Sequence, residues 1–172
     1  MLSLRFSEFS GIVWRHTAVV QPPLDMLPNA SRGGRFNPAF SFPMLYTSIS
    51  VRGAKAEFIK STRAYKVAPE SLLPRMFHQL EISLQKVVDL TDKRNRRFLG
   101  CSFEDLIGNN WTPTQKIGIK LRNICDAILS YSAADLKHKN LNLYIINSTT
   151  VSVVTSTVIR TMSDWDYPKP VM

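Results

Sequence analysis

The sequence is poor in the features that mark secreted, zinc-binding and membrane proteins. Its two cysteines, Cys101 and Cys125, have neither a Cys-X-X-Cys partner nor a nearby pair of histidines, which disfavours a structural zinc site and a disulfide framework. No stretch approaches the roughly 18 apolar residues that a membrane helix needs, and Arg5 and Glu8 interrupt the first apolar residues, unlike in a secretory signal. We therefore expect a cytoplasmic protein with buried free thiols and no membrane partner.

Histidines are also few. The three histidines, His16, His78 and His138, lie far apart in the sequence and lack the spacing of metal ligands. The sequence therefore predicts no metal site, and it assigns no histidine a catalytic role.

The chain lacks internal repeats, low-complexity tracts and an evident interdomain linker. Its 172 residues, of which 44% are hydrophobic, are enough for one domain with a real core and too few for two comfortable ones. The sequence thus predicts a single domain over residues 1–172.

Acidic residues are scarce, because 13 Asp and Glu stand against 22 Lys and Arg and leave a formal net charge of +9. This charge favours an anionic partner: a nucleic acid, a nucleotide or an acidic protein surface. The sign of the charge does not choose among the three. The densest basic cluster, "DKRNRR" at residues 92–97, lacks the interleaved aromatic residues on which single-stranded nucleic acids stack, and we interpret it as a solvated loop.

Hydrophobic periodicity predicts both strands and helices. Leu80, Ile82 and Leu84 alternate with polar residues, as on one face of a strand, and the C-terminal third is rich in Val, Thr and Ile, which favour strands. The predicted strands cover residues 42–48, 79–88, 139–147 and 150–160, and the predicted helices cover residues 53–64 and 112–124. The expected fold class is α+β.

The helix predicted over residues 112–124 is marked by its first residues, and the one predicted over residues 53–64 by a single carboxylate. At the start of the helix over 112–124, Thr112 can cap the helix, Pro113 suits its first turn and Gln115 completes a capping box. In the helix over 53–64, Glu57 lies at the flank of the inward face. From the residues alone, Glu57 reads as a surface carboxylate paired with Lys60, which contributes only a few tenths of a kcal/mol.

A series of short motifs changes that interpretation. They are "WRH" at 14–16, "GGRFNP" at 33–38, "LYTSIS" at 45–50, "AEF" at 56–58, "LEISLQKVVDLTD" at 80–92, "NNWTPTQKIGIKLR" at 109–122 and "DAILSYSAADLKHKNLNLYIIN" at 126–147. Their order over residues 13–147 resembles the RES-domain family, toxins of bacterial toxin–antitoxin pairs that are named for an arginine, a glutamate and a serine. The resemblance implies one domain with a fold related to ADP-ribosyltransferases: a twisted β-sheet core with flanking helices and NAD in a cleft.

The resemblance assigns site residues where the motifs match. The motif arginine falls on Arg35, the strand tyrosine on Tyr46 and the helix glutamate on Glu57. A guanidinium fork beside Gly34, whose backbone N–H can approach closely, suits the pyrophosphate of NAD; otherwise Arg35 only covers a turn. Tyr46 can stack on the cationic nicotinamide or be a half-buried strand residue. Glu57, the main catalytic candidate, would hydrogen-bond the ribose and stabilise its positive charge.

The remaining site residues match less closely. The family serine falls on Ser132, with Ser130 as a competitor, because Tyr131 stands where the family has proline. No histidine and carboxylate accompany this serine, so positioning substrate suits it better than nucleophilic attack. Arg15 and Asn37 complete the expected substrate-binding set, although an arginine beside a tryptophan is often cation–π packing.

The function that the resemblance implies is depletion of cellular NAD by cleavage of its nicotinamide–ribose bond. NAD is the substrate, phosphate or water the expected acceptor, and no cofactor or metal is expected. A cognate Xre-type antitoxin is the expected protein partner, in a hetero-oligomeric complex, and direct nucleic-acid binding is not expected. Protein ADP-ribosylation is the alternative, and a non-enzymatic basic nucleic-acid-binding protein is a more remote one.

Overall fold

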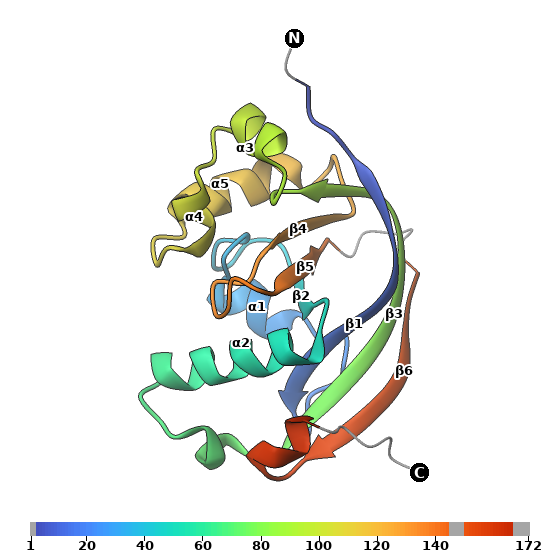
Figure 1. The fold of residues 1–172 in the computed structure, drawn as a ribbon, viewed down its shortest axis with the longest axis vertical. Coiled ribbons are helices and arrows are strands. Elements are labelled where there is room, and N and C mark those ends of the chain that lie inside the picture. The colour runs from blue at the N-terminus through green and yellow to red at the C-terminus, as the bar shows by residue number, and fades with distance from the viewer. Residues whose placement is uncertain (1–2, 145–149, 167–172) are drawn as a thin grey trace.

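The computed structural model describes residues 3–144 and 150–166, and within them it confirms the α+β class (Figure 1). The strands are β1 (Ser7–Ala18), β2 (Leu45–Ser48), β3 (Arg75–Asp89), β4 (Ala127–Tyr131), β5 (Lys139–Leu143) and β6 (Thr150–Ile159). The helices are α1 (Leu27–Arg32), α2 (Val51–Ala64), α3 (Lys93–Leu99), α4 (Phe103–Ile107) and α5 (Thr112–Leu121), with short 3₁₀ helices η1 (Pro69–Leu72) and η2 (Met162–Asp166).

The strands form one strongly bent sheet. Its hydrogen-bonded order is β1-β2-β5-β4-β3-β6, and β1 also pairs with β3. The strands β1, β2, β5, β4 and β3 therefore close a ring, and β6 pairs with β3 outside that ring. The β3–β4 pair is parallel and the other pairs are antiparallel. The long strands β1, β3 and β6 curve along one side of the molecule, and the helices lie on the other (Figure 1).

The ring gives each of its strands an inner and an outer face. The inner face is apolar and fully buried, and its members are Val13, Leu45, Leu80, Ile82, Leu84, Val87, Ala127, Leu141 and Leu143. On the outer face, α4 and α5 cover one apolar cluster, which contains Phe36, Met44, Ile117, Leu121 and Ile128. The helices α2 and η2 cover another, which contains Phe58, Phe77 and Trp165.

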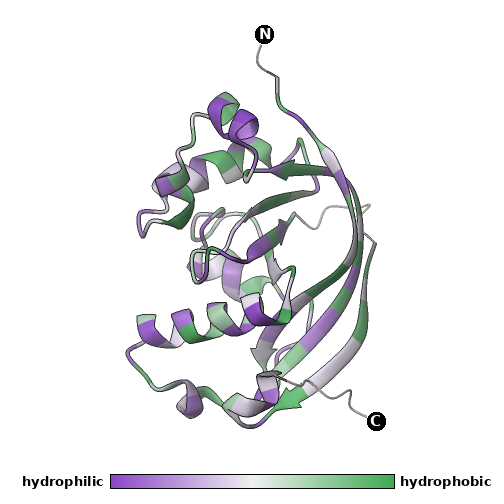
Figure 2. Cartoon of the chain, in the orientation of Figure 1, coloured by the Kyte–Doolittle hydropathy of each residue, from purple (hydrophilic) through white to green (hydrophobic). Residues whose placement is uncertain are grey.

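Strand β3 shows why the alternation in the sequence was informative. Leu80, Ile82 and Leu84 are buried, whereas Glu81 and Ser83 between them are exposed. Figure 2 shows hydrophobic and hydrophilic residues alternating along the long strands. The predicted strand over 150–160 is confirmed as β6, and the predicted strand over 139–147 is observed as β5, with residues 145–147 outside the described part.

Two local predictions were wrong. Residues 92–97 do not form a loop, because Asp92 accepts a hydrogen bond from the Arg94 N–H at 2.8 Å and caps α3, which ends at Gly100 in the left-handed conformation. Helix α5 has no capping box: Trp111 is its N-cap, and Gln115 donates instead to the Gly34 carbonyl at 3.0 Å. Gln115 thus serves the loop of the GGRFNP motif rather than its own helix.

Helix α2 starts two residues before the predicted position. Ser50 is its N-cap and accepts a hydrogen bond from the Gly53 N–H at 3.1 Å. The helix buries Ala54 and Phe58 against the sheet, so Glu57 stands at the edge of the buried face as expected. Within the described residues, no helix is long and apolar enough to span a membrane.

Candidate active site

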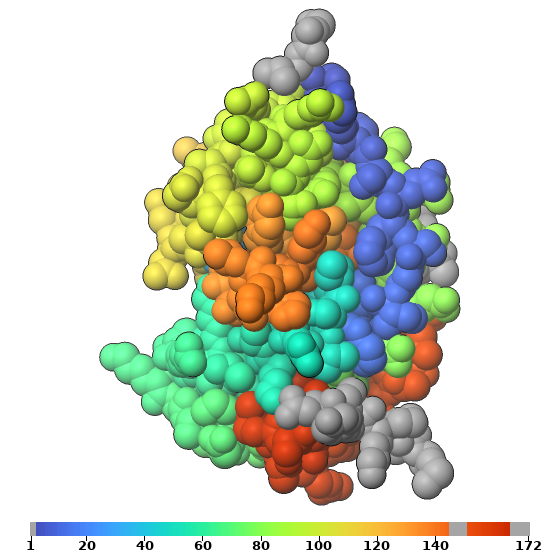
Figure 3. Space-filling model, viewed as in Figure 1, coloured from blue at the N-terminus to red at the C-terminus, as the bar shows by residue number. Residues whose placement is uncertain are grey.

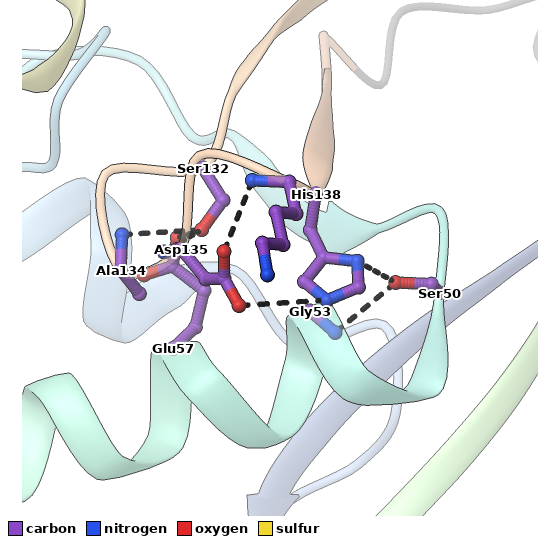
Figure 4. Close-up of polar contacts among 8 residues, drawn as sticks. Ser50, Gly53, Glu57, Ser132, Ala134, Asp135 and His138 are labelled. Atoms are coloured by element: carbon purple, nitrogen blue, oxygen red, sulfur yellow. Dashed lines mark hydrogen bonds and ion pairs between the residues drawn. The ribbon is translucent and has the colours of Figure 1, made fainter.

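The Glu57 carboxylate is fixed by two side chains that come from a different part of the chain. Its Oε1 atom accepts a hydrogen bond from Ser132 Oγ at 2.7 Å and another from Asn140 Nδ2 at 2.6 Å. Ser132 directly follows β4 and Asn140 lies on β5, and Figure 4 shows Glu57 rising from α2 toward the loop that joins these strands (Figure 4). The Glu57 carboxylate is therefore held by contacts across the fold.

Ser132 is the serine of the pair that reaches Glu57. Its side chain is fully buried, donates to Glu57 and accepts from the backbone N–H groups of Ala134 at 3.1 Å and Asp135 at 3.2 Å. One donor and two acceptors are all that a hydroxyl offers. Ser130 instead accepts from Asn142 Nδ2 at 3.2 Å. The bonds of Ser132 suit it to holding Glu57; its predicted contact with substrate stays a prediction.

Sequence reasoning missed Asn140 and its neighbour Ser48. Ser48 donates to Asn140 Oδ1 at 2.8 Å, so the Asn140 amide bridges a hydroxyl on β2 and the carboxylate on α2. A signal was present in the alternation of residues 140–143, "NLNL". Because Leu141 and Leu143 point to the inner core, the two asparagines must face outward, toward the helices.

The same loop is tied to the start of α2. His138 Nδ1 lies 2.9 Å from Ser50 Oγ, and its Nε2 faces the Asp135 carboxylate at 3.7 Å (Figure 4). The same Ser50 oxygen accepts a hydrogen bond from the Gly53 N–H at 3.1 Å, so one hydroxyl joins the His138 ring to the first turn of α2. His138 thus helps to seat the loop that carries Ser132.

Tyr46 and the GGRFNP loop form a second hydrogen-bonded unit. The Tyr46 hydroxyl donates to Asn37 Oδ1 at 2.7 Å and accepts from the Phe36 N–H at 2.9 Å. A Cβ on Gly34 would lie 2.5 Å from that hydroxyl, so only glycine fits beside the ring. Burial raises the pKa of Tyr46 far above its usual value, and its hydroxyl stays protonated. Tyr46 therefore shapes the loop; its predicted stacking on nicotinamide stays a prediction.

Asn37 is completely buried inside this loop. Its Nδ2 donates to the carbonyls of Asn29 at 2.8 Å and Phe42 at 3.2 Å, while its oxygen is taken by Tyr46. These bonds make Asn37 a scaffold of the loop. Its predicted contact with substrate stays a prediction.

Arg35 is held on the opposite side of the loop by α4 and α5. Its Nη1 donates to the Gly108 carbonyl at 2.9 Å, and its guanidinium lies 5.8 Å from the centre of the Trp111 ring. Its backbone carbonyl accepts from Thr114 Oγ1 at 2.7 Å. Helix α5 packs directly on this loop, because a Cβ on Gly118 would overlap the Phe36 carbonyl. A position set by so many contacts suits an arginine that must meet a ligand in a fixed orientation.

The charges of Arg35, Lys60 and Glu57 act on one another. Burial lowers the pKa of Arg35, and the Glu57 carboxylate opposes that change. The pKa of Lys60 is lowered by burial and then by the Arg35 charge, and Glu57 again opposes. Lys60 Nζ donates to the Ala133 carbonyl at 3.1 Å, next to Ser132. The structure therefore brings the predicted arginine, glutamate and serine into one region.

Arg15 does not join this region. It is opposite His78 in the β1–β3 pair, on the inner side of the ring with Val13, whereas its neighbour His16 faces outward and contacts Phe58 of α2. Its Nη2 donates to the Asp25 carbonyl at 2.6 Å, and burial lowers its pKa to about 10, opposed by the Asp25 charge. Alternation along β1 thus points Arg15 away from Glu57, and its predicted phosphate contact stays a prediction.

On the surface, the segment that contains Ser132 and Asn140 lies between α2 and the α3–α4 region (Figure 3). Two hollows lie elsewhere: one of about 300 Å³ between the end of α3 and α5, and one of about 670 Å³ beside α1. Glu57 lines neither of them. Among residues 3–144 and 150–166, no group of three or more His, Cys, Asp or Glu could hold a metal ion.

The sequence is similar to those of two proteins of Mycobacterium tuberculosis. The chain is 26% identical over 113 residues to the NAD(+) phosphorylase MbcT of Mycobacterium tuberculosis, a match that covers 64% of this chain and 61% of MbcT. It is 31% identical over 125 residues to a probable NAD(+) phosphorylase of the same organism, which covers 72% of this chain and 59% of that protein. The chain thus spans about three-fifths of the length of these curated relatives.

The fold has a counterpart among solved structures. The crystal structure of the M. tuberculosis MbcT–MbcA toxin–antitoxin complex matches with a TM-score of 0.82 at 20% identity, over 94% of this chain and 90% of that one. The RES domain model matches residues 12–169. With Arg35, Glu57 and Ser132 drawn together by the fold, this match shows that the chain belongs to the RES domain family.

Proposed function

We propose that this protein cleaves the nicotinamide–ribose bond of NAD and transfers the ADP-ribosyl group to inorganic phosphate. Two relatives that bear the name NAD(+) phosphorylase support the proposal. The observation that carries it is the Glu57 carboxylate, which is held on one oxygen by Ser132 and Asn140. The chemistry needs a fixed negative charge of this kind.

Glu57 stabilises the positive charge that develops on the ribose. As the bond between C1 of the ribose and the nicotinamide nitrogen lengthens, its electron pair moves to the nitrogen and leaves an oxocarbenium-like sugar. Two donors on Oε1 orient the carboxylate before substrate arrives, so no reorganisation is needed in the transition state. The Oε2 atom is then directed to the ribose.

Arg35 binds the pyrophosphate of NAD in this proposal. Its Nη1 is anchored on the Gly108 carbonyl, which fixes the plane of the guanidinium. A planar, permanently charged fork recognises phosphate oxygens in two directions, which a lysine cannot do. We expect the reaction to need no added metal or cofactor, since this charge already meets the pyrophosphate; activity in the presence of EDTA checks that expectation.

We also propose that the protein acts in the cytoplasm as a toxin and is neutralised by a partner protein. The structural counterpart was solved as a complex of a toxin with its antitoxin. The net charge of +9 gives an acidic segment of an Xre-type antitoxin a surface to bind. Co-purification with the product of the neighbouring gene, followed by an activity assay of the complex, tests this part of the proposal.

The decisive test uses the purified protein with NAD alone. We expect release of nicotinamide, together with phosphorylated ADP-ribose when inorganic phosphate is present and ADP-ribose when it is not, as identified by mass spectrometry. Labelling of proteins in a lysate would indicate protein ADP-ribosylation instead. If a folded, antitoxin-free protein leaves NAD intact, the enzymatic function is excluded, and salt-dependent nucleic-acid binding becomes the function to test.

A further inference from the structure

Lys60 stands beside the catalytic carboxylate and is absent from every motif that identified the site. It follows Glu57 by three positions on α2, and residues at this spacing are neighbours on a helix surface. Lys60 Nζ donates to the Ala133 carbonyl at 3.1 Å, while Glu57 accepts from Ser132. The two side chains therefore reach consecutive residues of one loop, which places an ammonium group next to the carboxylate.

The charge around Lys60 suits an anion. An ammonium group has three N–H donors, and the Ala133 carbonyl takes one of them. The side chain is half-buried, and it lies in the electrostatic field of both Arg35 and Glu57. Arg35 and Lys60 thus bring two cations into the field of Glu57, next to the group that faces the ribose.

We propose that Lys60 binds the inorganic phosphate that accepts the ADP-ribosyl group, and so determines whether phosphate or water takes the sugar. The proposal rests on the proposed NAD cleavage. A phosphate oxygen forms a bond to C1 of the ribose while the bond from C1 to the nicotinamide nitrogen breaks. The electron pair of the broken bond neutralises the nicotinamide ring. The new phosphate monoester, formed from the phosphate monoanion with both of its protons, then loses one proton to water.

Phosphate oxygens can come to Lys60 from the inorganic ion or from the pyrophosphate of NAD. Steady-state kinetics separates the two sources, because the KM for one substrate is measured with the other saturating. Lys60→Met removes the charge at nearly constant length, and Lys60→Arg retains it. Arg63→Met is the matched control, since Arg63 is an exposed cation one turn further along the same helix.

The expected result is specific to phosphate. In Lys60→Met the KM for phosphate rises roughly tenfold, because one charge-assisted hydrogen bond to phosphate is lost. The KM for NAD changes less than twofold. The fraction of unphosphorylated ADP-ribose in the product rises, Lys60→Arg restores most of the phosphate dependence, and Arg63→Met behaves as wild type. Inorganic phosphate raises the Tm of wild type more than that of Lys60→Met, which reports binding without turnover.

Three results obtained with Lys60→Met would overturn the proposal. They are an equal or larger rise in the KM for NAD, an unchanged KM for phosphate, and a loss of nicotinamide release in phosphate-free buffer as large as the loss with phosphate. The last would show that Lys60 only seats the loop through Ala133. Wild-type protein that releases nicotinamide at a rate independent of phosphate would refute the role of Lys60 and leave NAD cleavage standing. Wild-type protein that releases none would refute both.

Discussion

The inner and outer faces of strands β2, β4 and β5 differ sharply although they belong to the same short segments. The inner face consists of side chains such as Leu45, Leu141 and Leu143, all fully buried in the ring. The outer face carries hydroxyl and amide groups that hydrogen-bond to one another and to Glu57, namely Ser48, Ser130, Asn140 and Asn142. One face therefore stabilises the fold, while the other arranges the chemistry, and alternation along a strand keeps the two apart.

The largest expected effect tests the outer face. Glu57→Gln keeps the shape of the side chain and removes its charge, so we expect nicotinamide release to fall by about 100- to 1000-fold, the usual cost of losing an electrostatic contact to a transition state. The free energy of unfolding, measured by urea denaturation, should change little. Wild-type turnover by this variant would exclude Glu57 as the group that stabilises the sugar.

The next largest effect tests the inner face at Leu141, which lies between Asn140 and Asn142 in the sequence. Leu141→Ala empties part of the ring core, where Leu141 is 0% exposed, and should lower the free energy of unfolding by about 2–5 kcal/mol. Activity per folded molecule should stay within about twofold of wild type, because Leu141 points away from Glu57. Leu136→Ala, at a side chain that is 50% exposed, is the control for stability. A large loss of activity in folded Leu141→Ala would break the separation of the two faces.

A smaller effect sharpens the role of Asn140. Asn140→Asp sets a second carboxylate against Glu57 Oε1, where the amide nitrogen now lies at 2.6 Å. Like charges raise the apparent pKa of such a pair, so the acidic limb of the pH–rate profile should move to higher pH and activity at pH 7 should fall about tenfold. Asn123→Asp adds the same charge at an exposed position and should leave the profile unchanged. An unshifted profile for Asn140→Asp would mean that the amide does not govern the carboxylate.

The effect that is smallest near neutral pH concerns His16 of β1 and His78 of β3. Burial lowers the pKa of His16 to about 3 and that of His78 to about 4, with the nearby arginines adding to the shift. The unfolded chain therefore binds more protons below about pH 6.5, and stability present above that pH should be lost as pH falls toward 4, by up to about 1.4 kcal/mol per pH unit for each histidine. Urea denaturation of His78→Gln should show a shallower dependence; an unchanged slope would contradict the assignment.

The sequence predicted the parts of the fold in which one face is apolar and the other polar. Leu80, Ile82 and Leu84 revealed β3 for this reason. Strand β1 was missed because Arg15 and Thr17, at alternate positions, are buried polar residues and hide its periodicity. The pairing of β1 with β3, which no local pattern reports, decides its conformation.

The candidate site was predictable mainly through the family resemblance. Glu57 looks like a surface residue in its own helix, since its partners Ser132 and Asn140 lie more than 70 positions away, as their sequence separations of 75 and 83 show. Periodicity carries no information about such distant contacts. Only the fold reveals that Asn37 and Tyr46 brace the loop of Arg35, because both hydrogen bonds depend on how β2 meets that loop.

The attachment of the loop between β4 and β5 to α2 also has a consequence for motion. Ser132, Ala133 and His138 each bond to a side chain of α2 or its cap, at Glu57, Lys60 and Ser50. Segments joined at three points cannot open separately without breaking those bonds, so the loop and the helix form one cooperative unit. Amide hydrogens of the loop should therefore exchange with solvent at the opening rate of α2, and a partner that loosens this helix would dismantle the carboxylate site without touching it.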